Sequence, residues 1–260
     1  MSISTYFSAY NLLTHGFSGW EKNLVNACKF SDEVIIALNT SEDDTDTAIR
    51  NTLWEFDNWK IVPANFSKLD PMFDGRLKNL ALQNTTKEFK IQMDVDESIP
   101  LWQKPLWENA LFKLKFSGAK VLAVPSVDFY KTVDGYKSIS FKTYAHFGEA
   151  YRGPALGALK AGYFIDTQVS DGTELIDKNF QPLPAIASGP REMAELEKGD
   201  QIFVAHWGYL NVAERIERTR QFWGAHWLQE SGGALPIHQI HYDESTFDHY
   251  EYRKHNLRLE

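Results

Sequence analysis

KEFKIQMDVDE, residues 87–97, alternates apolar and polar side chains from Phe89 to Asp96. An alternation of period two is typical of a β-strand that lays one face against a core, and it places Asp94 and Asp96 on the same side of that strand. We therefore predict a strand over residues 88–96 whose carboxyl end presents two neighbouring carboxylates.

The segments before this run alternate between strand-like and helix-like patterns. Ser18 and Glu21, at the start of the first helical segment, have the spacing of a capping box. A helix between successive strands requires parallel pairing, so the sequence predicts an α/β fold with a mostly parallel sheet flanked by helices. The expected strands are residues 2–10, 32–39 and 59–64, and the expected helices are residues 18–29, 46–57 and 71–85.

The chain after residue 97 is expected to differ from the first part. A helix is predicted at residues 101–118, followed by strands at residues 119–132 and 136–147. Asp-Gly at residues 134–135 lies between the two strands and is a strong signal for a β-hairpin. Apolar residues at helical spacing over residues 212–230 predict a C-terminal amphipathic helix.

Length and composition favour one large ordered domain. The chain has 260 residues, of which 43% are hydrophobic and 14% aromatic, and it contains no low-complexity run. This is more than a minimal domain and less than two ordinary ones. We predict a single domain over residues 1–230, followed by a C-terminal tail over residues 231–260 that serves as an interaction surface.

Charge and cysteine content exclude several classes of protein. A formal net charge of −8 argues against nonspecific binding to nucleic acid or to anionic membranes, because both depend on clustered Lys and Arg. An anionic ligand would need a local exception to this charge. The single cysteine, Cys28, excludes an internal disulfide, and neither a signal-peptide pattern nor a long apolar stretch is present. We expect a soluble, cytoplasmic protein.

Polar side chains follow three of the predicted strands. Tyr10 and Asn11 follow the first strand, NTSEDD at residues 39–44 follows the second, and Asp94 and Asp96 end the fourth. The carboxyl ends of parallel strands meet at one edge of a sheet, where ligands bind. Carboxylates there suit Mg²⁺ or Mn²⁺, which prefer oxygen ligands and substrate phosphates. The acidic run has a second interpretation, in which Asp44 or Thr45 caps the N-terminus of the next helix.

In order and spacing, these parts resemble the nucleotide-sugar glycosyltransferases of the GT-A fold, especially those of family 2. The likeness rests on an opening strand that ends in Tyr-Asn, the acidic NTSEDDT, GRLKNLAL on the third helix, and KEFKIQMDVDE. The resemblance implies a GT-A domain with a nucleotide-binding half at residues 1–97 and an acceptor half at residues 98–230. It also implies a UDP- or GDP-linked sugar donor, a saccharide or other hydroxyl acceptor, and Mn²⁺ or Mg²⁺ as cofactor.

The resemblance also implies roles for individual residues. Arg76 would face the donor phosphates, whose geometry a guanidinium matches, although an ion pair with a carboxylate also fits it. His206, at the end of an apolar strand, resembles a late metal-binding histidine and favours manganese, although a hydrogen-bonded core residue also fits it. The implied donor-binding residues are Tyr10, Asn11, Glu42, Asp43, Arg76, Asn79 and Asp94, and the implied metal ligands are Asp94, Asp96 and His206.

Transfer of a sugar to a hydroxyl also requires a base within hydrogen-bonding reach of the acceptor. Asp171, in SDGTEL, is the first candidate, with Glu174 and Glu149 as rivals. The acidic pair that is usual in family 2 is not cleanly present here. Asp171 before Gly172 also fits a turn.

Two other functions stay open. A sugar-phosphate nucleotidyltransferase of similar fold would need a glycine-rich, basic phosphate loop after the first strand. The segment YNLLTHGFSGW, residues 10–20, contains two glycines but no Lys or Arg, which disfavours that function. A non-catalytic relative that only binds nucleotide or glycan is the other alternative, and the presence of Asp94, Asp96 and Arg76 argues against it.

Overall fold

The structure is a computed structural model, and it describes all residues except 15–17, 68–72, 153–174, 180 and 217–251. No helix within these described segments is long and apolar enough to cross a membrane.

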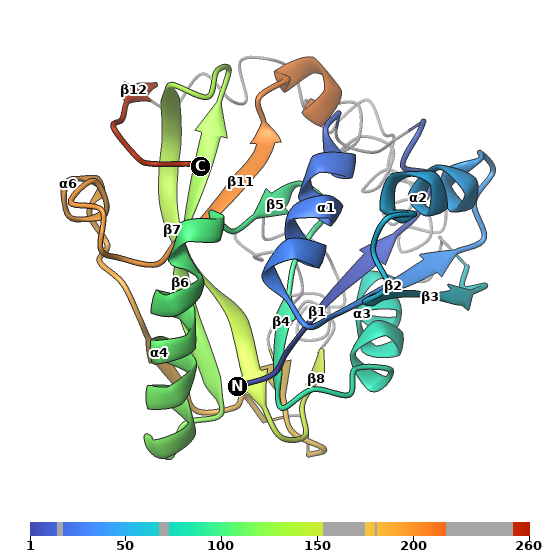
Figure 1. Ribbon diagram of the computed structural model, residues 1–260, viewed down its shortest axis with the longest axis horizontal. Coiled ribbons are helices and arrows are strands. Elements are labelled where there is room, and N and C mark those ends of the chain that lie inside the picture. The colour runs from blue at the N-terminus through green and yellow to red at the C-terminus, as the bar shows by residue number, and fades with distance from the viewer. Residues whose placement is uncertain (15–17, 68–72, 153–174, 180, 217–251) are drawn as a thin grey trace, which may run out of the picture.

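Strands and helices alternate along the first half of the chain, as predicted (Figure 1). The described strands are β1 Ile3–Ala9, β2 Glu33–Asn39, β3 Trp59–Ala64, β4 Phe89–Gln92, β5 Glu97–Ser98, β6 Val121–Tyr130, β7 Gly135–Phe147, β8 Tyr151–Arg152, β9 Leu175–Ile176, β10 Ala185–Ala187, β11 Val204–Tyr209 and β12 Arg253–Lys254. The helices are α1 Trp20–Phe30, α2 Thr45–Leu53, α3 Phe73–Gln83, α4 Lys104–Phe116 and α6 Met193–Leu196, with a 3₁₀ turn at Leu101–Gln103.

One mixed sheet forms the centre of the molecule, with the strand order β3-β2-β1-β4-β7-β6-β11-β5. β1, β2, β3 and β4 are parallel, which confirms the prediction for the first half. β7 is antiparallel to both β4 and β6, and β6 is parallel to β11. The carboxyl ends of β1, β2, β4, β6 and β11 therefore lie at one edge of the sheet, whereas β7 ends at the opposite edge.

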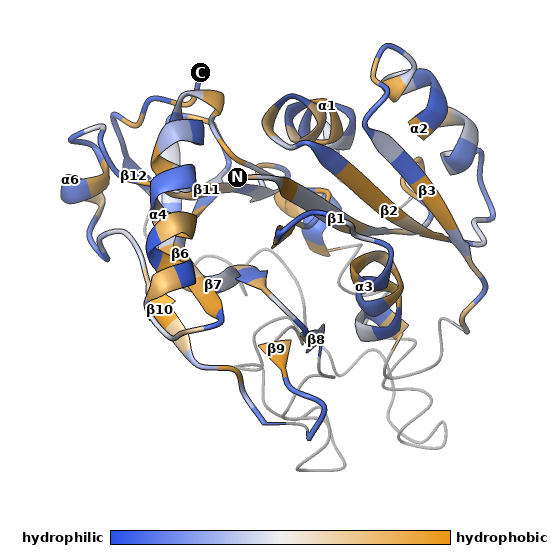
Figure 2. Ribbon diagram, turned by 60° about the horizontal axis from the view of Figure 1, so that its bottom comes forward, coloured by the Kyte–Doolittle hydropathy of each residue, from blue (hydrophilic) through white to orange (hydrophobic). Residues whose placement is uncertain are grey.

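Helices cover both faces of this sheet. Successive side chains of a strand point to opposite faces, so one strand contributes to the core on each side. Leu24, Ile49 and Leu111, one each from α1, α2 and α4, share a core with Phe7 of β1. The preceding residue, Tyr6, packs against α3 on the other face. Figure 2 shows α1 and α2 on one side of β1 and β2, and α3 on the other.

The predicted hairpin is present as β6 and β7, and the end of the chain packs against it. β12 pairs antiparallel with β7, Leu257 is buried in the core beside β6, and Trp102 Nε1 donates to the carbonyl of Arg258 at 3.0 Å. Residues 252–260 are therefore part of the folded domain, unlike the separate tail predicted for residues 231–260. Of the predicted C-terminal helix, residues 212–216 are described and helical.

The capping box predicted at α1 is wrong. The N-cap is Gly19, in the left-handed region with φ 116°, and no side chain caps the helix. Ser18 instead donates its backbone N–H and its hydroxyl to the carboxylate of Glu214, at 2.7 and 3.1 Å. A distant acceptor has thus replaced the local cap, and it ties the start of α1 to the helical residues after β11.

Candidate functional site

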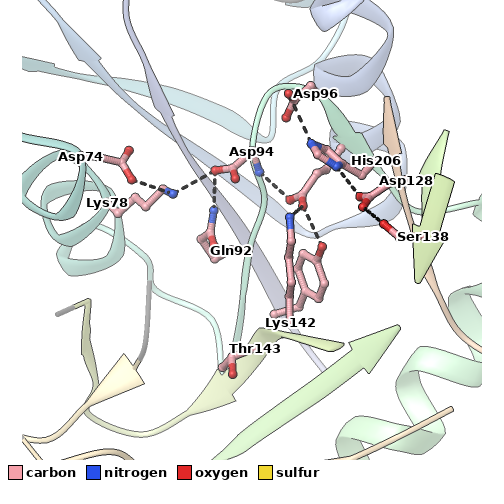
Figure 3. Close-up of polar contacts among 12 residues, drawn as sticks. Asp74, Lys78, Gln92, Asp94, Asp96, Asp128, Ser138, Lys142, Thr143 and His206 are labelled. Atoms are coloured by element: carbon pink, nitrogen blue, oxygen red, sulfur yellow. Dashed lines mark hydrogen bonds and ion pairs between the residues drawn. The ribbon is translucent and has the colours of Figure 1, made fainter. Parts of the chain in front are cut away.

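The predicted strand over residues 88–96 ends early, at Gln92, and residues 93–96 turn away from it. Asp94 and Glu97 close this turn: the backbone N–H of Glu97 donates to the carbonyl of Asp94, and the backbone N–H of Asp94 donates to Glu97 Oε2, both at 2.9 Å. The alternation of the sequence therefore does not continue to Asp96. As Figure 3 shows, Asp94 and Asp96 have different neighbours rather than one shared side.

Asp94 is held by residues of the parallel half. Its Oδ1 lies 3.0 Å from Lys78 Nζ and accepts a hydrogen bond from Gln92 Nε2 at 2.9 Å. Lys78 is buried and also pairs with Asp74 at 2.9 Å. Burial alone would lower the pKa of Lys78, but the two carboxylates raise it above its ordinary value. Asp94 thus takes part in a buried ion-pair network of α3.

Asp96 is buried and faces the strand that follows the hairpin. Its Oδ2 lies 3.5 Å from His206 Nε2 and 3.9 Å from Arg215 Nη1. The other ring nitrogen, His206 Nδ1, lies 2.7 Å from Asp128 Oδ1 (Figure 3). Asp96, His206 and Asp128 therefore form a continuous chain of polar contacts.

Two carboxylates set the protonation of His206. Burial and Lys142 lower its pKa, but Asp96 and the hydrogen bond to Asp128 outweigh them and raise the pKa to about 9. Burial would raise the pKa of Asp128, yet its contacts with His206 lower it to about 2. At neutral pH the apo site thus holds an imidazolium between two carboxylates.

Gly208 lies directly against the Asp96–His206 contact. A Cβ at this position would lie 2.6 Å from Asp96 Oδ2 and 2.8 Å from His206 Nε2, closer than such atoms pack. The two candidate metal-ligating atoms, Asp96 Oδ2 and His206 Nε2, therefore lie next to the same backbone position. A carboxylate and an imidazole suit Mn²⁺, and substrate phosphates commonly complete such a coordination sphere.

Two protein side chains, Asp96 and His206, are thus placed to ligate a divalent cation. Among the residues that the structure describes, no group of three or more His, Cys, Asp or Glu is arranged to hold a metal ion. Asp96 and His206 can hold a cation once the His206 proton is displaced, because a metal-bound imidazole is neutral. Asp94, engaged by Lys78, would have to leave that ion pair to join them.

The predicted nucleoside residues lie together where β1 and β2 end. Asn11 is buried in the left-handed region with φ 46°, and its Oδ1 accepts the backbone N–H of Glu42 at 2.7 Å. Asp43 accepts the backbone N–H of Thr14 at 3.0 Å, and such hydrogen bonds lower its pKa although burial opposes the shift. Tyr10 packs edge-on against Phe73 of α3. Asn11 and Asp43 thus join the two loops. Asp44 is the N-cap residue of α2 but its side chain makes no capping hydrogen bond, whereas Asp43 Oδ1 accepts the backbone N–H of Thr45 at 3.1 Å.

The two α3 residues predicted to face the donor occupy different surroundings. Arg76 is exposed. Asn79 is bonded to the backbone of Arg152 in both directions, with its Oδ1 accepting at 2.7 Å and its Nδ2 donating at 2.9 Å. Asn79 therefore anchors β8, and the α3 side chain that reaches Asp94 is Lys78, which the sequence interpretation had not selected.

The candidates for the acceptor base are not brought together. Asp171 and Glu174 lie outside the described residues. Glu149 is exposed and follows β7, whose last residue, Phe147, pairs with Phe89 at the start of β4. Glu149 therefore lies at the edge opposite Asp96, and the structure does not bring this candidate acceptor base to the predicted metal ligands.

Several buried polar residues beside the site were not predicted. Glu97 accepts hydrogen bonds from Tyr144 at 2.7 Å and from Lys142 at 3.4 Å, and burial raises its pKa despite the Lys142 ammonium. Asp128 on β6 was likewise missed. A signal existed for Asp128, because a charged residue within an otherwise apolar strand needs a partner. The identity of that partner depends on the pairing of β6, β7 and β11.

No family model and no curated protein matches this chain. Comparison with solved structures finds TarS 1-349 from S. aureus, at 15% identity over 92% of this chain and 68% of that chain, with a TM-score of 0.45. It also finds the mannosyltransferase PcManGT from Pyrobaculum calidifontis, in complex with GDP-Man and Mn²⁺, at 16% identity over 89% of this chain and 63% of that chain, with a TM-score of 0.47.

A third likeness is to 4-diphosphocytidyl-2C-methyl-D-erythritol synthase from Anaerococcus prevotii, at 15% identity over 66% of this chain and 80% of that chain, with a TM-score of 0.37. The set includes GT-A-type glycosyltransferases, the kind of protein that the sequence resembles. At these identities and TM-scores, the likenesses do not assign an activity to this chain.

Proposed function

We propose that this chain is a metal-dependent glycosyltransferase, which moves a sugar from a UDP- or GDP-linked donor to a hydroxyl acceptor such as a saccharide. The observation that supports this most is the convergence of Asp96 Oδ2 and His206 Nε2 beside Gly208. It occurs at the edge where β1, β2 and β4 end, next to the loops that hold Asn11 and Asp43.

The protein groups of this corner have separable tasks. Asp96 and His206 are the proposed ligands of the cation, and Asp128 fixes the orientation of the imidazole through Nδ1. When bound, Mn²⁺ would act as a Lewis acid that offsets the charge developing on the departing diphosphate. Arg215, 3.9 Å from Asp96, carries a guanidinium that can contact phosphate oxygens.

The nucleoside would lie over the loops that follow β1 and β2. The contacts of Asn11 with Ser41 and Glu42 fix the shape of this surface without any ligand. Glu42 is exposed there and is the carboxylate we propose for the ribose hydroxyls or a base N–H. Tyr10, packed against Phe73, would border the base.

The base that accepts the proton of the acceptor remains a prediction from the sequence. Asp171 and Glu174 are the two candidates that the structure leaves open. Either one would have to reach hydrogen-bonding distance of the acceptor hydroxyl when substrates are bound.

The proposal is tested by a thermal-shift and calorimetry panel of UDP, GDP, UTP and CTP with and without Mn²⁺. We expect a nucleoside diphosphate to bind in a metal-dependent manner. Asp96→Asn should abolish the metal-dependent part, and Gly208→Ala should weaken it strongly, because the added methyl group occupies the space between the two ligands. Asp57→Asn, at an exposed carboxylate after α2, is the matched control and should bind like the parent.

Each other outcome has a definite meaning. A metal-dependent preference for a triphosphate would favour the nucleotidyltransferase. Metal-dependent binding of a diphosphate that Asp96→Asn leaves intact would reject the site. Binding without hydrolysis of any UDP- or GDP-sugar would favour a non-catalytic relative.

A further inference from the structure

A cavity lies beside the proposed metal corner, at the same edge of the sheet. Its volume is about 520 Å³, and it is lined by Tyr130 and Lys131 at the end of β6 and by residues 210–213 after β11. Tyr209 lies between this cavity and the metal corner in the chain, and its ring centroid is 5.4 Å from that of His206. Tyr209 therefore contacts His206 and directly precedes the residues that line the cavity.

Three cationic side chains gather on the aromatic residues of this region. Lys137 Nζ lies 3.9 Å from the ring centroid of Tyr209, and the Arg215 guanidinium lies 4.9 Å from the same centroid. Lys131 Nζ lies 5.1 Å from the ring centroid of Tyr130, the cross-strand partner of Tyr209. The chain has a net charge of −8, and these three side chains form the local positive region that an anionic ligand requires.

Two carboxylates, Asp96 and Asp128, lie near these cations. Asp128 is hydrogen-bonded to His206 and Ser138, and Asp96 faces His206. Burial lowers the pKa of Lys137 to about 8, a shift that Asp128 opposes and Arg215 increases. A bound anion would stabilise the charged form of such a lysine, because it would offset both the burial and the neighbouring positive charge.

We propose that this cavity binds an anionic group of the acceptor, a phosphate or a carboxylate, with Lys131 from its lining and Lys137 from the ring of the adjacent Tyr209 as its partners. The inference rests on the glycosyltransferase function proposed above, and it narrows the acceptor from any hydroxyl compound to an acidic one. The donor diphosphate is the less suitable occupant, because Asp96, His206 and Arg215 form its proposed site and none of them is among the described residues that line the cavity.

The test is calorimetry with three probes: glucose 1-phosphate, glucuronate and glucose. Each is titrated into the protein alone and into the protein saturated with UDP and Mn²⁺, so that a filled diphosphate site cannot account for binding. We expect one or both anionic probes, but not glucose, to bind under both conditions. Which one binds distinguishes a phosphate from a carboxylate.

The variants are Lys131→Asn, Lys137→Gln and the double variant. Asn suits position 131 because the backbone there is left-handed, with φ 61°. Loss of a charge-assisted hydrogen bond should weaken anion binding about tenfold in a single variant, and more in the double variant. Affinity for UDP with Mn²⁺ should stay within about twofold, since neither lysine belongs to that site. Lys113→Gln, at an exposed lysine of α4, is the control.

The outcomes separate this inference from the function on which it rests. Equal anion binding by the parent and the double variant, or no anion binding by the parent, would overturn the inference and leave the glycosyltransferase proposal intact. Anion binding that depends on the two lysines, without any nucleotide binding, would reject the glycosyltransferase proposal and the acceptor role, and would retain the anion site. Lys131→Asn alone, at an exposed residue, keeps the test valid if Lys137→Gln fails to fold.

Discussion

The parallel half of the molecule and the half built on the β6–β7 hairpin contribute differently to the same corner. Asp94 and Asp96 are two residues apart, yet Asp94 pairs with Lys78 of α3, whereas Asp96 faces His206 of β11. The first contact joins neighbouring parts of the chain. The second joins residues more than a hundred positions apart, so it exists only when the second half has folded onto the first.

This difference suggests separate roles for the two aspartates. Asp94 belongs to an ion-pair network around the buried Lys78 that supports the position of α3, whereas Asp96 belongs to a polar chain that borders Gly208. We therefore expect changes around Asp94 to act mainly on stability and changes around Asp96 to act mainly on binding.

The largest effect is expected from Lys78→Met. This change leaves Asp74 and Asp94 close together without their shared cation, and breaking a buried pair costs about 3–5 kcal/mol. Because both carboxylates are about one-third exposed, we expect the lower end, about 3 kcal/mol. The measurement is the free energy of unfolding from urea denaturation.

Arg50→Met is the matched control, because Arg50 also pairs with an aspartate one helical turn away but is exposed. It should cost less than about 0.5 kcal/mol. Equal losses in the two variants would contradict the assignment of Asp94 to a stabilising network.

A pH effect of intermediate size is expected from His206 in the metal-free protein. Its pKa is raised from 6.5 to about 9, so its contribution to stability is full below pH 6.5 and is lost as the pH rises through 9. Between pH 6.5 and 8, the free energy of unfolding should fall by up to about 2 kcal/mol. The measurement is urea denaturation across this range, with chelator present.

The pH range ends at 8 because, above that value, Lys137 changes the free energy of unfolding in the direction opposite to His206. The pKa of Lys137 is lowered from 10.5 to about 8, so its loss of a proton between these values favours the folded state. His206→Gln should remove the fall between pH 6.5 and 8. An unchanged fall in that variant would show that another group is responsible.

The smallest effect is expected from Glu149→Gln. Glu149 lies at the edge of the sheet opposite Asp96, so the change should alter sugar transfer or donor hydrolysis by less than about twofold. Asp171→Asn and Glu174→Gln, measured in the same assay, test the two remaining base candidates. A loss of about a hundredfold or more with Glu149→Gln alone would contradict the position assigned to it.

The first half of the fold could be predicted because its signals are local. The apolar run of β2 and the stripes of α1 and α3 each fall within one element, and parallel pairing follows from the intervening helices. The end of β4 could not be predicted in this way. The alternation continues in the sequence through Val95, but Glu97 pairs with β11 and turns the chain after Gln92.

The site was predictable to a similar extent. Asp96 was selected from its position at a predicted strand end and His206 from the resemblance to GT-A glycosyltransferases, and the structure brings them to 3.5 Å. Lys78 was missed although one of its partners, Asp74, lies one helical turn away. Asp128 and Glu97 were missed because their importance comes from partners on other strands of the sheet. The predicted capping role of Ser18 failed for the same reason, since Glu214 lies 196 positions away in the sequence.

Gly208 has a consequence for the descent of this chain. Its missing side chain is needed beside Asp96 and His206, while the sheet that carries it is held by contacts made elsewhere. A mutation of this single residue should therefore remove the proposed metal-dependent activity and leave the sheet intact. Relatives that have become pseudoenzymes should be recognisable by a larger residue at this position.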